Sequence, residues 1–84
     1  MSQNPFLRVR KEMGLTVAEF AAAVGLGSST ILLLEKGAIL TPRIPLQKIA
    51  ELGYDSEKLG QEYSAWRKEL GDSIRSSMSF QKGA

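Results

Sequence analysis

The segment from Leu15 to Gly37 constrains the fold more than any other part of the chain. Two short runs of apolar residues with α-helical spacing lie on either side of Gly25. Glycine can adopt the left-handed conformation that a tight turn requires. One face of the first run carries Ala18, Phe20, Ala21 and Val24, and the matching face of the second carries Ile31 and Leu34. The segment therefore predicts a helix-turn-helix over about residues 16–36.

Capping signals predict where the first helices begin and end. Asn4-Pro5 is a favourable helix start, and Gly14 is a favourable end. Phe6, Val9 and Met13 share one face between them. Thr16, followed three residues later by Glu19, predicts a capping box at the start of the second helix. The third helix is expected to begin at Gly27 or Ser28 and to end at Gly37.

The second half predicts two more helices after a loop over residues 38–44. The fourth helix should cover about Pro45 to Leu52, with an inward face formed by Leu46, Ile49, Ala50 and Leu52. Asp55 or Ser56 should cap a fifth helix over about residues 56–75. From Ser76 onward the periodicity is lost, so residues 76–84 are predicted to form a disordered tail after a single domain over residues 1–75.

The fifth helix carries one apolar stripe, which consists of Leu59, Tyr63, Trp66, Leu70 and Ile74. This stripe can pack back on the domain, or part of it can form a two-fold interface with a second copy of the chain. We expect Leu59 and Tyr63 to lie mostly in the core. We expect Trp66, Leu70 and Ile74 to lie mostly in a dimer interface.

Composition argues against an enzyme. The chain of 84 residues has no histidine and no cysteine, which removes the commonest general base, the commonest transition-metal ligand and thiolate chemistry. The acidic residues are scattered, and no phosphate-binding glycine loop is present. We therefore expect no catalytic residues, no metal and no cofactor. We also expect a cytoplasmic protein, because no signal peptide and no apolar run long enough for a membrane span is evident.

The small positive charge is unevenly distributed. Up to Arg43 the chain has five basic and three acidic residues, whereas the remainder has six of each. The excess of positive charge therefore lies on the helix-turn-helix half, which favours nucleic acid only mildly, since strong DNA-binding domains are usually more basic.

The chain resembles the lambdoid phage repressor and Cro family, the XRE-type helix-turn-helix, over about residues 6–59. The residues that carry the resemblance are Arg10, Gly14-Leu15, Ala18-Glu19, Ala21, Val24-Gly25, Ile31, Leu34-Glu35, Gly37, Pro42 and Leu52-Gly53. The resemblance implies an all-α bundle of about five helices, with an extra C-terminal helix here. It also implies an ion pair between Arg10 and Glu35, and a dimeric transcriptional regulator of phage or plasmid type that binds double-stranded DNA.

The same resemblance implies which residues contact DNA, namely Thr16, Val17, Ser28, Ser29, Leu32, Leu33, Lys36 and Arg43. Lys36 and Arg43 suit phosphates, and Leu33 suits a thymine methyl group. No side chain on the third helix can form a bidentate pair with guanine or adenine, which predicts weak or shape-based recognition.

Leu32 and Leu33 support an alternative function. Because Ile31 and Leu34 occupy the core face, these two leucines are expected near the surface, together with Val17. Adjacent exposed leucines usually mark a contact with protein. The alternative is a helix-turn-helix reused as a protein-interaction module through Val17, Leu32 and Leu33.

Overall fold

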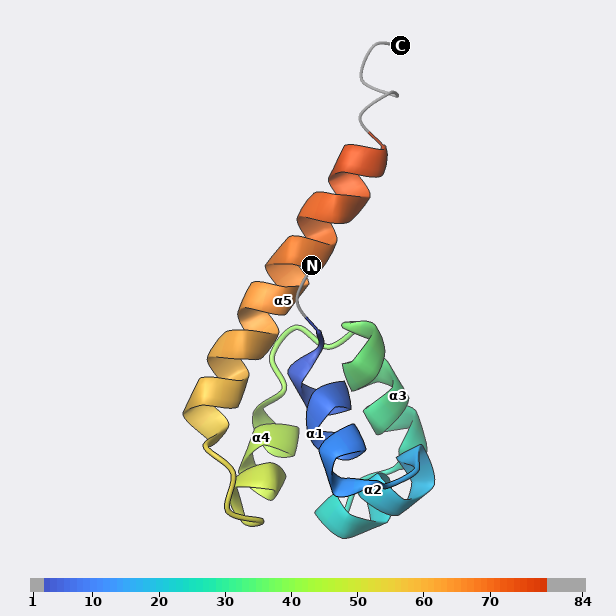
Figure 1. Ribbon diagram of the computed structural model, residues 1–84, viewed down its shortest axis with the longest axis vertical. Helices are drawn as coiled ribbons and strands as arrows, with labels where there is room; N and C mark the ends of the chain where they lie inside the picture. The colour runs from blue at the N-terminus through green and yellow to red at the C-terminus, as the bar shows by residue number, and fades with distance from the viewer. Residues whose placement is uncertain (1–2, 79–84) are drawn as a thin grey trace.

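The computed structural model describes residues 3–78, and within that range the chain forms helices joined by loops, with no strand (Figure 1). The five helices are α1 (Pro5–Met13), α2 (Val17–Val24), α3 (Ser28–Lys36), α4 (Arg43–Ala50) and α5 (Ser56–Ser77). The expected all-α class and helix number are therefore confirmed.

The predicted caps form as the local sequence indicates. The Oδ1 atom of Asn4 accepts the backbone N–H of Phe6 at 2.9 Å, and Pro5 occupies the first turn of α1. Thr16 and Glu19 form the complete capping box of α2. Gly25, with a φ of +71°, ends α2 in the left-handed region, where glycine carries no steric cost.

A three-residue turn, residues 25–27, joins α2 to α3, and the chain bends there by 109°. This turn length and this angle are those of a helix-turn-helix. No single described helix is long and apolar enough to cross a membrane, and only α2 and α3 taken together as a bent pair reach that length and composition.

The core draws on all five helices. α5 packs on α1 and α4, while α3 contacts both α1 and α2. The buried apolar side chains of the core are Phe6, Val9, Phe20, Ala21, Val24, Ile31, Leu34, Ile49, Leu59, Tyr63 and Trp66. The rings of Phe6 and Tyr63 meet edge to face, and the Tyr63 hydroxyl donates to the carbonyl of Ile39 at 2.6 Å. Tyr63 therefore fixes the loop between α3 and α4 against α5.

The C-terminal half of α5 extends past the other helices, so the molecule is elongated, at 49 × 23 × 20 Å (Figure 1). This helix continues to Ser77, two residues beyond the predicted end, so Ser76 and Ser77 are helical rather than part of a tail. Residues 79–84 of the predicted tail lie outside the described range.

Three further expectations require correction. α4 begins at Arg43 and ends at Ala50, rather than covering Pro45 to Leu52, because its first turn accommodates Pro45. Ala50 and Leu52 are exposed and only Ile49 of the expected inward face is buried, with Leu46 packed partly against the core. Ala18 is also exposed, although it was expected on the inner face of α2.

Candidate nucleic-acid interface

α3 is held by one face and presents the other to solvent. Ile31 and Leu34 are only 1% and 0% exposed, whereas Leu32 and Leu33 are 44% and 45% exposed. The remaining candidate residues of this face, Ser28, Ser29 and Lys36, are exposed as well. The structure thus brings the predicted contact residues of α3 onto one accessible surface.

Asn4 anchors the C-terminal end of α3. Its Nδ2 atom donates to the carbonyl oxygens of Leu34 and Glu35 at 2.8 and 3.1 Å, while its Oδ1 atom caps α1. The side chain is 3% exposed, so these hydrogen bonds are shielded from competing water. The orientation of α3 is therefore set partly from outside the helix-turn-helix.

The predicted pair between Arg10 and Glu35 forms with two-point geometry. Arg10 donates from Nε and Nη2 to the two carboxylate oxygens of Glu35 at 2.6 and 3.0 Å, and from Nη1 to the carbonyl of Leu15 at 3.0 Å. The hydrogen bonds to Glu35 raise the pKa of Arg10 above its ordinary value. Both side chains are largely buried, so the pair fastens α1 to α3.

The start of α2 is less available than the sequence suggests. The backbone N–H of Thr16 donates to the Glu19 carboxylate at 2.9 Å, and the Thr16 hydroxyl oxygen accepts the N–H of Glu19. Hydrogen bonds from the backbone N–H and from the side chain of Thr16 lower the pKa of the Glu19 carboxylate, which keeps it charged beside the helix start. The amide and the hydroxyl of Thr16 are therefore both engaged with Glu19 at the start of α2.

Val17 contributes less to an apolar surface patch than expected. It is half-buried and packs against the core cluster. The adjacent leucines of α3 are consequently the main exposed apolar feature of the helix-turn-helix.

Arg43 lies at the first turn of α4, exposed, at the edge of a groove of about 360 Å³. Thr30 of α3 lines the same groove, together with Ile39, Thr41, Pro42, Ile44 and Pro45. Arg43 is therefore placed next to α3, although its position in the sequence is more than ten residues away from Thr30.

Lys36 also lines a second hollow that the sequence did not predict. This concavity, of about 520 Å³, lies between the end of α3 and the C-terminal half of α5. Its other basic residues are Arg67, Lys68 and Arg75. They come from a segment about thirty to forty residues away from Lys36, so only the tertiary fold brings these charges together.

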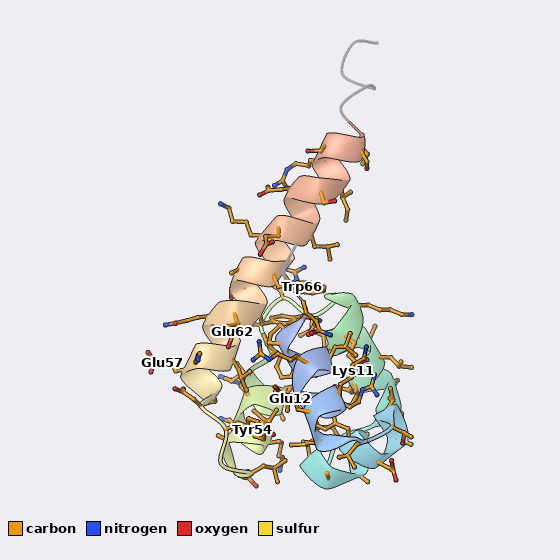
Figure 2. The ribbon with its side chains drawn as sticks, viewed as in Figure 1. Lys11, Glu12, Tyr54, Glu57, Glu62 and Trp66 are labelled. Atoms are coloured by element: carbon orange, nitrogen blue, oxygen red, sulfur yellow. The ribbon has the colours of Figure 1, made fainter. Side chains whose placement is uncertain are left out.

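The predicted dimer residues do not share one environment. Trp66 is only 8% exposed and lies in the core where α5 passes the bundle (Figure 2), with its ring centroid 5.9 Å from that of Tyr63. Leu70 is half-buried against the core, and Ile74 is 49% exposed. An interface formed by this helix therefore has Ile74 and part of Leu70 available, with little of Trp66.

No metal site is evident among residues 3–78, where no group of three or more potential ligands comes together. Comparisons of the chain with family models, with curated proteins and with solved structures gave no match.

Proposed function

We propose that the chain is a DNA-binding transcriptional regulator of the lambdoid repressor and Cro type, with α3 directed into the major groove. The single observation that supports this most is the α2–α3 pair, with its three-residue turn and 109° bend, which exposes one face of α3. This is the arrangement with which a helix-turn-helix reads DNA. A protein of this kind acts in the cytoplasm of its host.

The proposed affinity comes mainly from phosphate contacts. Lys36, the last residue of α3, and Arg43, the first residue of α4, are exposed, and neither takes part in an ion pair described for residues 3–78. Ser28 and Ser29 can both donate and accept hydrogen bonds, so they discriminate poorly between bases. Recognition would depend on the shape and flexibility of the DNA more than on base contacts.

The proposed active form is a homodimer. Two copies related by a two-fold axis would place two α3 helices about 34 Å apart, one turn of the double helix. The exposed Ile74 and the half-buried Leu70, on the part of α5 that extends past the bundle, are the candidate contacts.

Fluorescence anisotropy with a labelled duplex from the gene's own upstream region tests DNA binding. The affinity should fall steeply with salt, because each phosphate contact releases counterions. Lys36→Ala/Arg43→Ala should remove most of the binding. The control variant Lys48→Ala/Lys58→Ala removes the same amount of charge outside the hollows that flank α3, and it should retain most of the duplex binding.

The exposed Leu32 and Leu33 support one second candidate, a protein-docking module. Absence of duplex binding even at low salt would favour this candidate over a DNA-binding protein. A pull-down with the wild type and with Leu32→Ser/Leu33→Ser would then show whether a partner depends on these side chains.

A further inference from the structure

We propose that α5 supplies a second row of contacts to the phosphates of a nucleic acid, through Lys68 and Arg75 in the concavity that Lys36 shares. This inference rests on the proposed function and adds residues outside the helix-turn-helix. The concavity has a volume of about 520 Å³, and its cations are Lys36, Arg67, Lys68 and Arg75. Leu70 and Ile74, the proposed dimer contacts, line it too, so the inference requires a dimer that leaves these cations open to solvent. None of the described residues that line it is acidic.

The four cations are not equivalent. Arg67 forms part of the wall of the concavity and is held in place there, because its Nε atom donates to the carbonyl of Gly37 at 2.8 Å. Arg75 pairs with the Asp72 carboxylate, but both side chains are more than half exposed, so a phosphate can compete for this guanidinium. Lys36 and Lys68 are exposed and belong to none of the ion pairs described within residues 3–78.

The spacing of these cations suits an extended polyanion. Lys68 and Arg75 are seven residues apart on α5, which places them on the same side of the helix and about 10 Å apart along its axis. Three base-pair steps of a DNA duplex cover about the same distance along the duplex axis, at ~3.4 Å per step. Gly71 lies between the two cations and adds no side chain to the floor of the concavity.

The concavity is continuous with the proposed DNA-reading surface. Lys36 is exposed on α3 and also lines the hollow against α5. Lys68 in turn lines a neighbouring hollow of about 220 Å³ with Leu40, Ser64 and Arg67. A backbone that leaves the groove at α3 would therefore pass from Lys36 to Lys68 and then to Arg75, without crossing an acidic lining residue.

The experiment compares salt slopes of the full chain with the same labelled duplex. Lys68→Gln and Arg75→Gln should each reduce the slope of log affinity against log salt by about 0.9, the value for one lost phosphate contact. Lys58→Gln is the matched control, since Lys58 is also exposed on α5 but lines none of these hollows. It should leave the slope unchanged, and circular dichroism should show that all three variants fold.

The outcomes separate this inference from the proposed function. In one outcome the wild type binds the duplex, Lys36→Ala/Arg43→Ala does not, and Lys68→Gln and Arg75→Gln keep the full salt slope. This outcome overturns the contribution of α5 and leaves the DNA-binding proposal standing. If the wild type does not bind the duplex at all, the proposed function itself fails. Labelled polyglutamate that binds through Lys68, when the duplex does not, would assign the concavity to an acidic protein.

Discussion

Gly37 ends α3 with a φ of +79°, and it faces the ring of Trp66. A Cβ atom at this position would lie 2.6 Å from Cζ3 of Trp66 and 3.2 Å from Cδ2 of Leu70. We expect Gly37→Ala to destabilise the fold by about 2–5 kcal/mol, the sum of left-handed strain and overpacking. Urea denaturation followed by the fluorescence of Trp66 measures this loss.

Gly25→Ala is the control for this prediction. Gly25 has a similar φ of +71°, but no neighbouring atom lies within 4 Å of the position a Cβ would take. This variant should lose only the strain component, about 1–2 kcal/mol. Equal losses in the two variants would show that the close approach of Gly37 to Trp66 does not limit stability.

The pair of Arg10 and Glu35 gives a second prediction at the scale of single residues. Arg10→Ala leaves a largely buried carboxylate and the carbonyl of Leu15 without their donors, and should cost about 2–4 kcal/mol. Arg8→Ala removes a comparable pair with Glu62 that is roughly one-third exposed, and should cost under about 1 kcal/mol. Thermal denaturation of the two variants tests the difference, and an equal cost would contradict it.

At the scale of the helices, the capping box of α2 predicts a pH dependence. Hydrogen bonds from Thr16 lower the pKa of Glu19 in the folded protein below its ordinary value of 4.5. A group with a lowered folded pKa stabilises the fold above its unfolded pKa, and this contribution is lost as pH falls through the folded pKa. Glu19→Gln keeps an acceptor without the charge, so the advantage of the wild type should shrink on acidification.

Melting temperatures of the wild type and Glu19→Gln, measured from about pH 6 to about pH 3, test this prediction. A difference that stays constant over the whole range would mean that the Glu19 carboxylate is not stabilised by folding. Glu62, whose pKa is lowered mainly by the hydrogen bond from Arg8, titrates in both proteins and cancels in the comparison.

The apolar stripe of α5 passes from buried residues to exposed ones. The first half of α5 is a core helix, and Trp66→Ala should cost about 3–5 kcal/mol, because an almost fully buried ring leaves a cavity. Ile74→Ala, on the half that extends past the bundle, should cost under about 0.5 kcal/mol when the monomer is measured at low protein concentration. Chemical denaturation of both variants tests this boundary within the helix, which the periodicity of the stripe does not reveal.

Helix ends were the most predictable level of structure. Thr16 with Glu19, Gly25 and Asp55 act within a few residues of their own positions, and so does Asn4 where it caps α1, so the local sequence contains the whole capping interaction. The start of α4 was misplaced because Pro45 was interpreted as its first residue, whereas proline is tolerated throughout the first turn. These local signals locate the first turn of a helix, but they do not determine which residue begins it.

At the scale of the whole molecule, the proposed dimer makes a prediction about mass. Leu70→Ser/Ile74→Ser should shift the chain toward the monomer in sedimentation equilibrium, with the helical content retained. Lys58→Gln, at the opposite end of α5, should not change the mass. A wild type that is monomeric at all concentrations tested would remove the dimer from the proposed function.

The arrangement of the candidate site was predictable only in part. The exposed face of α3 and the pair of Arg10 with Glu35 followed from the pattern of one segment and a resemblance to a family. The concavity beside Lys36 did not, because Lys68 and Arg75 reach it through the packing of α5 on α1 and α4. Trp66 was assigned to an interface for the same reason, since its contact with Gly37 spans almost thirty residues.

The amide of Asn4 joins the first turn of α1 to the last turn of α3 across about thirty residues of chain. Helix ends usually fray independently, but the start of α1 and the end of α3 share the Asn4 side chain. Fraying of these two ends is therefore coupled. Hydrogen exchange of the amide protons in these two turns should therefore give the same free energy of opening. The last turn of α3, the helix proposed to contact DNA, would then stay folded for as long as the first turn of α1 stays folded.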